Sequence, residues 1–101
     1  MPTKDYNEFL FEQLRDPGFA AEYLSVSVKD GTIEEFLLAL RHVAQAYGGI
    51  AAISDITNLN RQSMYKMLSE DGNPRLINLM AVLKAVGIEM RFTVSSGKDA
   101  A

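Results

Sequence analysis

Residues Ile50–Ser69 read IAAISDITNLNRQSMYKMLS, and this stretch decides the fold of the 101-residue chain. Apolar residues recur at helical spacing on both sides of a polar break at Thr57 and Asn58, which predicts two short helices and a tight turn. Such a turn requires a positive φ, and asparagine is among the few residues besides glycine that tolerate it. Asn60 is a good N-cap for the second helix. The spacing is that of a helix-turn-helix.

The inner faces of these two helices carry side chains that can hold them together. Ser54 is small, as expected where two helices cross closely. The side chains expected to lock the pair are Ile53, Thr57, Leu59, Met64 and Met67.

The outer face of the second helix carries polar side chains that predict DNA recognition. Arg61 can form two hydrogen bonds to guanine, and Gln62 can do so to adenine. Ser63 and Tyr65 can bond phosphate or a base edge, while Lys66 neutralises phosphate. The predicted DNA-binding residues are Asn60, Arg61, Gln62, Ser63, Tyr65, Lys66 and Arg75. Short helix pairs with polar outer faces also occur in many all-α domains, so an ordinary helical domain is the competing interpretation.

Further helices with clear start and stop signals flank this segment. Asp16-Pro17 supplies an N-cap and then a proline at the first helical position. Thr32 and Glu35 form a capping box, and Gly48-Gly49 ends the helix that follows. The predicted helices cover 5–14, 17–30, 33–47, 50–56, 61–68 and 74–86. The last one is expected to turn inward Ile77, Met80, Ala81 and Leu83.

Length and composition exclude several classes of protein. The chain is 48% hydrophobic and 23% charged, an ordinary balance for one globular domain. It has no cysteine and one histidine, which excludes thiol chemistry and histidine-cluster metal sites. We expect neither cofactor nor metal. The sequence also predicts no secretory signal and no membrane span, so a cytoplasmic protein is the default expectation.

The charge distribution is asymmetric along the chain. The formal net charge is −3. Residues 1–58 carry four basic and nine acidic side chains, whereas residues 59–101 carry six basic and four acidic ones. This pattern indicates either two surfaces for two partners or a patchwork of solvated charges.

Other polar residues have structural interpretations. His42 is expected on the surface, without a catalytic role. Glu34 and Glu35 point about 100° apart on a helix, which argues against paired acid–base chemistry. Arg75 is expected either to reach a phosphate or to form a salt bridge with Glu70 or Asp71. The methionines predicted to fill the core are Met64, Met67, Met80 and Met90.

Several ordered motifs resemble the HigA-like antitoxins of bacterial addiction modules, over about residues 16–94. Two positions depart from the family pattern: Gly18 stands where an acidic residue is usual, and Asn58 replaces the usual turn glycine. The motifs that carry the resemblance are Asp16–Leu24, Phe36–Arg41, Thr57–Tyr65 and Leu68–Arg75.

This resemblance implies a lambda-repressor-like helix-turn-helix domain. Together with the pattern of the residues, it leads us to expect an all-α bundle of five to six short helices with one C-terminal β-strand. It further implies a non-enzymatic antitoxin that binds a small, basic RelE/ParE-like toxin and, as a homodimer, the double-stranded operator DNA of its own operon. We expect residues 1–31 to be a helical segment for toxin contact or dimerisation, residues 32–94 the DNA-binding domain, and residues 95–101 a frayed tail. A stand-alone repressor and a protein-interaction module with a vestigial helix-turn-helix are the alternatives.

The strand is predicted at Ile88–Val94, where apolar and polar residues alternate with period two. An exposed strand edge pairs readily with another chain. Three partners are therefore open: a second copy in a two-stranded ribbon, the sheet of the toxin, or Val26–Val28 of the same chain.

Overall fold

The structure is a computed structural model that describes residues 6–95, and over this range it consists of six helices and no strand. The protein is therefore all-α in this range. The helices are α1 (Tyr6–Leu14), α2 (Pro17–Asp30), α3 (Ile33–Ala46), α4 (Ile50–Thr57), α5 (Arg61–Met67) and α6 (Leu76–Ala85).

The caps predicted for α2 and α3 are formed. The Asp16 side chain accepts a hydrogen bond of 3.2 Å from the backbone N–H of Phe19, directly before Pro17. Thr32 accepts from the backbone of Glu35 at 3.1 Å, and Glu35 accepts from the backbone of Thr32 at 2.8 Å. These local bonds satisfy helix-end N–H groups, so the sequence fixes both starting points.

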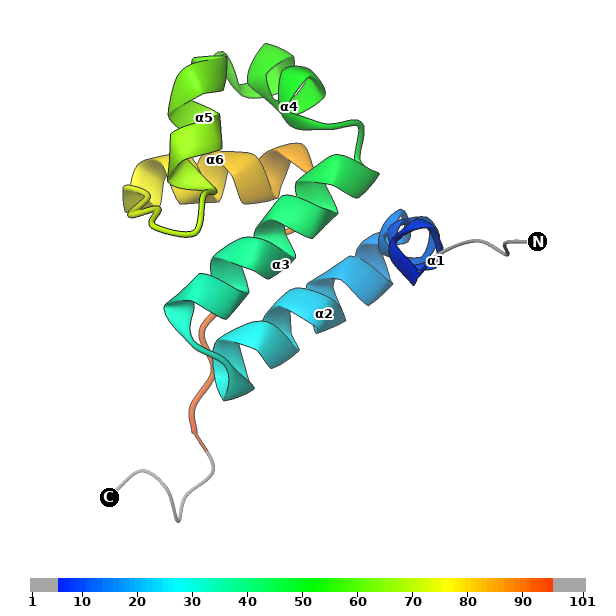
Figure 1. Ribbon diagram of the computed structural model, residues 1–101. Helices are drawn as coiled ribbons and strands as arrows, with labels where there is room; N and C mark the ends of the chain where they lie inside the picture. The colour runs from blue at the N-terminus through cyan, green and yellow to red at the C-terminus, as the bar shows by residue number, and fades with distance from the viewer. Residues whose placement is uncertain (1–5, 96–101) are drawn as a thin grey trace, which may run out of the picture.

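The helices form two groups joined by α3 (Figure 1). Helices α2 and α3 run side by side in opposite directions, with α1 packed against both, while α4, α5 and α6 gather on the opposite side of α3. One continuous core crosses both groups and includes Leu10, Leu24, Leu40, Val43, Ile53, Met64, Leu68 and Val82. The N-terminal helices thus share a core with the segment that contains the predicted recognition helix.

The chain bends by 88° between α3 and α4. Gly48 and Gly49 have φ values of 126° and 94°, which side-chain-bearing residues rarely adopt. No single helix described here is long and apolar enough to cross a membrane, and the bent α3–α4 pair passes that test only by length and composition.

Helix α6 corrects two expectations. It begins at Leu76, two residues after Pro74, and ends at Ala85. Its buried stripe runs through Leu79, Val82, Leu83 and Val86, which have the spacing of one helix face. Ile77 and Met80 lie off this stripe and are 72% and 49% exposed, although they were predicted to face inward. The predictions for Leu83, which is buried, and Ala81, which is half-buried, are confirmed.

Large apolar side chains of other helices are also exposed, although they recur at helical spacing with buried ones. Tyr6 and Phe9 face outward from α1, as do Ile33 at the start of α3 and Tyr47 just after its end. No further layer of helix covers these positions in residues 6–95, so helical spacing alone overestimates the core. Among the methionines predicted to fill the core, Met64 and Met67 are buried, whereas Met90 is exposed.

Residues 88–95, here called the C-terminal arm, do not form the predicted strand. A strand requires a hydrogen-bonded neighbour, and the candidate within the chain, Val26–Val28, is part of α2. Apart from the bond that the Ile88 N–H donates to Leu83, the described residues give the arm no backbone hydrogen bond. The predicted tail over 95–101 lies outside the described residues except for Ser95.

Candidate nucleic-acid interface

The turn between α4 and α5 is held by local hydrogen bonds. Asn58 adopts φ 63° and ψ 16°, the left-handed conformation expected at this position. The Thr57 hydroxyl donates to the carbonyl of Ile53 at 2.8 Å and accepts from the N–H of Leu59 at 3.2 Å. The Ser54 hydroxyl donates to the carbonyl of Leu59. This network satisfies the polar groups of the turn and fixes the direction in which α5 leaves it.

The apolar contacts predicted between the two helices are present. Ile53 and Met64 are completely buried, and Met67 is 8% exposed. Leu59 is half-buried and packs against the same core. Ser54 is buried and lies where the sequence predicted a close approach. Helix α5 is therefore anchored on one side, which leaves its other side free.

The free side carries the residues predicted to contact DNA. Asn60 accepts a hydrogen bond of 3.1 Å from the backbone N–H of Ser63, so it is the N-cap of α5 as expected. Tyr65 is 63% exposed. The other exposed members of this set are Asn60, Arg61, Gln62, Ser63 and Lys66. None of them is enclosed by another part of residues 6–95, so the structure brings these six together on one accessible helix.

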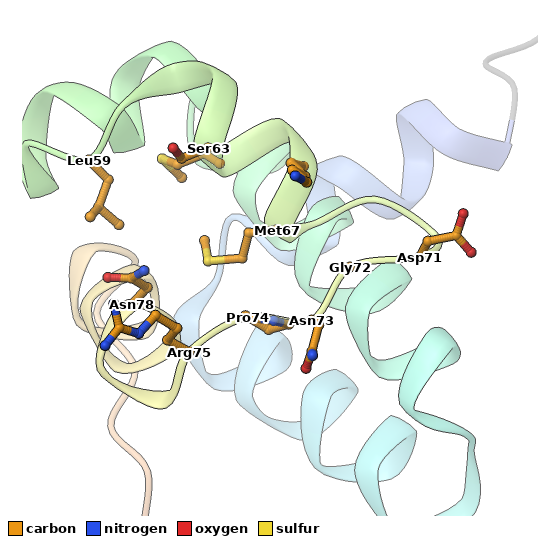
Figure 2. A pocket seen from close by; sticks show the side chains of 11 residues that line it. Leu59, Ser63, Met67, Asp71, Gly72, Asn73, Pro74, Arg75 and Asn78 are labelled. Atoms are coloured by element: carbon orange, nitrogen blue, oxygen red, sulfur yellow. The ribbon is translucent and has the colours of Figure 1, made fainter.

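Arg75 reaches the same region from another element. It is the exposed N-cap residue of α6, and it forms no ion pair with Glu70 or Asp71. It lines a groove of about 270 Å³, together with Ser63 and Lys66 of α5. Figure 2 shows Arg75 on the opposite wall of this groove from α5. The predicted alternative of a salt bridge is therefore wrong, and the guanidinium is available to a ligand.

Two amides on the same wall were missed by the sequence analysis. Asn73 and Asn78 line the groove beside Arg75 (Figure 2). Asn78 is a lone polar residue within the otherwise apolar run Leu76–Leu83. That interruption is the signal that marks it, because an amide within an apolar helix face needs a reason to be there.

Arg41 of α3 positions the far end of α5. Its guanidinium Nη1 donates to the carbonyl oxygen of Leu68, which is the C-cap residue of α5. A cation at a helix C-terminus also interacts favourably with the helix dipole. In the sequence, Arg41 is marked only as a basic residue that directly follows Leu40. The structure shows that Leu40 is completely buried. Arg41 is therefore a positioning residue for the candidate surface.

His42 is not the surface histidine that the sequence predicted. It is half-buried between helices, where its Nδ1 lies 2.9 Å from the Tyr23 hydroxyl and its ring meets Phe11 edge-on at 5.9 Å. Burial, and then the charge of Arg41, lower the pKa of the imidazole below its ordinary value of 6.5. Burial, and then the nearby Tyr6, raise the pKa of Tyr23. The pair ties α2 to α3 and lies away from the α5 surface.

Neither a metal cluster nor paired carboxylates emerge from residues 6–95. No three His, Cys, Asp or Glu side chains in this range come together to hold a metal ion. Glu35 is occupied by the capping box. The features left for function are an exposed polar helix, the turn that holds it and a groove whose opposite wall carries Arg75.

Comparison with known proteins identifies the family. An uncharacterised protein of Haemophilus influenzae strain Rd is 32% identical over 69 residues, which cover 68% of this chain and 70% of the relative. No solved structure matches the chain. Residues 5–94 match the family described as probable addiction module antidote protein. This match covers most of the chain, and the protein therefore belongs to the family of probable addiction module antidotes.

Proposed function

We propose that this antidote acts in two ways: it neutralises a RelE/ParE-like toxin by direct binding, and it represses its own operon by binding operator DNA. In this proposal α4, the turn and α5 are a helix-turn-helix of the lambda-repressor type, within a DNA-binding domain over residues 32–94. The protein is a binding protein of the cytoplasm and needs no catalytic group.

The observation that carries the DNA-binding proposal is the orientation of α5. Its apolar side is locked by Ile53 and Met64, while its first turn exposes Arg61 and Gln62. A major groove admits a helix in this way, with first-turn side chains at the base edges. A rigid turn stabilised by Thr57 lowers the cost of ordering these side chains on binding.

Each polar residue then has a separate role. Arg61 and Gln62 read guanine and adenine. Ser63, Tyr65 and Lys66 contact phosphate or an adjacent base edge, and Arg75 contacts phosphate from the opposite wall of the groove. As a homodimer, the protein would read two half-sites about one helical turn apart.

The charge distribution supports a separate surface for the toxin. Residues 1–58 have a net charge of −5, from four basic and nine acidic side chains. Toxins of the RelE/ParE type are expected to be basic, so this half of the chain offers electrostatic complementarity and faster encounter. We therefore assign toxin contact to the surface of α1 and α2, with the helical segment 1–31 as its main part.

The DNA-binding proposal is tested with the DNA upstream of the protein's own gene. We expect Arg61→Ala and Gln62→Ala each to lose discrimination at one base position, by about 1–3 kcal/mol. Lys66→Ala should instead weaken all sequences alike and reduce the salt slope by about 1. Lys84→Ala, an exposed lysine on α6, is the matched control. If Gln62→Ala equals wild type on every base variant in gel shifts, the assignment of Gln62 is wrong.

The toxin proposal is tested by co-expression with the product of the adjacent gene. We expect a small basic protein that co-purifies with the chain and is no longer toxic in its presence. A chain that binds upstream DNA but has no co-purifying neighbour would be a stand-alone repressor. A chain that binds the neighbour, with DNA affinity that does not change with salt, would be an interaction module with a vestigial helix-turn-helix.

A further inference from the structure

The C-terminal arm exposes apolar side chains that the bundle does not cover. Ile88 is half-buried against the core, but Phe92 and Val94 are 91% and 94% exposed. The arm leaves the bundle beside the junction of α2 and α3 (Figure 1), and its residues 88–92 line a hollow together with residues of α2, α3 and α6. An alternating segment with unpaired backbone groups is a template for strand pairing.

A hollow that is mainly apolar lies between the arm and the bundle. Leu24 and Val28 of α2, Phe36 of α3 and Leu83 of α6 line it on the side of the bundle, and residues 88–92 line it on the side of the arm. An isolated two-stranded ribbon is marginal in water, so a paired arm needs an apolar surface to pack on. The hollow supplies that surface next to the root of the arm.

Two charged residues of the arm indicate which partner would pair with it. Glu89 and Arg91 form an ion pair of 2.7 Å, so both side chains already lie on one side of the arm. Opposite charges that face each other across antiparallel strands stabilise the pair, and like charges destabilise it. Each symmetric register of two identical arms can therefore be judged by the residues it places opposite each other.

Only one symmetric register satisfies these charges. With the twofold axis at Met90, Glu89 of each copy faces Arg91 of the other, twice. With the axis at Glu89 two glutamates meet, and with the axis at Arg91 two arginines meet. With the axis at Phe92 neither charge gains an opposite partner. The Met90 register also places Phe92 opposite Ile88, next to the apolar hollow.

We propose that two copies of this chain dimerise through their arms, as an antiparallel two-stranded ribbon centred on Met90. Glu89 and Arg91 face each other across the ribbon, and Phe92 of each copy packs beside Ile88 of the other. The ribbon spans about five residues per strand, a usual strand length. The ribbon itself does not depend on the proposed function. Its consequence does, because a dimer of this kind brings two α5 helices to one operator.

Single-cysteine variants test the register, because the natural chain has no cysteine. Directly opposed residues have Cα atoms about 4.5–5.5 Å apart, within reach of a disulfide. We expect full-length Met90→Cys to form a covalent dimer on mild oxidation. Phe92→Cys alone should not form a covalent dimer. In this register the two copies of residue 92 are offset by four positions along the strands, which is about 13 Å. A mixture of Ile88→Cys and Phe92→Cys should cross-link to each other.

Charge exchange tests the same ribbon without cysteine. Glu89→Arg places arginine opposite Arg91 at both pairs, so the dimer measured by sedimentation should weaken by about tenfold or more. The double variant Glu89→Arg/Arg91→Glu should restore the wild-type dissociation constant. Because all these side chains are exposed in the single chain, circular dichroism should show unchanged helix content.

Several results would overturn the ribbon. These are a monomeric chain, equal cross-linking at 90 and 92, cross-linking at 92 alone, or a dimer insensitive to Glu89→Arg. A dimer that is insensitive to Glu89→Arg would use another surface, such as the exposed side of α6 with Ile77 and Met80.

If the arm instead pairs with the sheet of the toxin, Met90→Cys forms no disulfide-linked dimer, either alone or in the complex with the toxin. Upstream DNA binding and toxin co-purification, measured on the same variants, show whether the proposed function fails independently.

Discussion

The α4–α5 segment has apolar residues at helical spacing, whereas apolar and polar residues alternate in the C-terminal arm, and the apolar side chains of the two segments differ in burial. In α4 and α5, Ile53 and Met64 are completely buried, and the polar groups of the turn bond to one another. In the arm, Phe92 is 91% exposed, and no backbone hydrogen bond forms beyond Ile88 within the described residues.

The difference lies in where each segment finds its partner. A helix satisfies its own backbone, so two short helices and a turn need only a few apolar contacts to become a unit. A strand leaves its N–H and C=O groups unpaired until a neighbour arrives. The α4–α5 segment therefore satisfies its backbone within the chain, whereas the arm finds no strand partner among the described residues.

Truncation of one apolar side chain in each region gives the largest expected contrast. Ile53→Ala should lower the free energy of unfolding by about 2–5 kcal/mol, because it leaves a cavity in the core. Phe92→Ala should change the free energy of unfolding of the single chain by less than about 0.5 kcal/mol. Urea denaturation of dilute protein measures both. A large loss in the Phe92 variant would mean that the arm packs on its own bundle.

Two arginines give the next contrast. Arg41→Met removes a charged hydrogen bond to the C-cap of α5 and should cost about 1.5–3 kcal/mol. Arg91→Met removes an exposed ion pair and should cost the single chain less than about 1 kcal/mol. Thermal or urea unfolding measures the loss of stability in each variant. If both variants lose the same amount, Arg41 has no positioning role.

The turn residue tests how locally the α4–α5 unit is determined. Asn58→Ala should lower the free energy of unfolding by about 1–2 kcal/mol, because a β-carbon is disfavoured at φ 63°. Asn58→Gly should be neutral or slightly stabilising, since glycine adopts this conformation freely. If both variants unfold like wild type, the left-handed turn is not required.

The smallest expected effect is a pH dependence that belongs to the bundle alone. The folded chain holds the His42 pKa below 6.5, so protonation favours the unfolded state. The contribution of His42 to stability is therefore fully present above pH 6.5, the ordinary pKa that applies to the unfolded chain. It is lost as the pH falls through the lower pKa of the folded chain. Wild type should therefore lose more stability than His42→Gln between about pH 7.5 and about pH 5. His42 is the chain's single histidine, so an equal loss in both proteins would assign the effect to carboxylates.

Much of the fold was predictable because its signals are local. The Asp16 and Asn60 caps, the Thr32–Glu35 capping box and the left-handed Asn58 act within a few residues of themselves. Exposure of the first turn of α5 follows from the same periodicity that buries Met64. The residues of the candidate site on α5 could therefore be found from sequence alone.

Other features depend on contacts between distant segments. The Arg41–Leu68 bond joins residues 27 positions apart, and the Tyr23–His42 bond joins residues 19 positions apart. The outward rotation of Ile77 and Met80 follows from how α6 seats against its neighbours. No local pattern distinguishes these outcomes, because helical spacing shows that a stripe is apolar but not which of its residues will be covered.

The sequence by itself determined where helices start and stop, the left-handed turn before α5 and the polar character of that helix, because each depends on backbone conformation and neighbouring side chains. Only the tertiary structure decided that His42 is enclosed, that Arg75 faces α5 across a groove and that the arm lacks a partner within residues 6–95. Burial and strand pairing depend on segments far apart in the chain, and the path of the folded backbone alone brings those segments together.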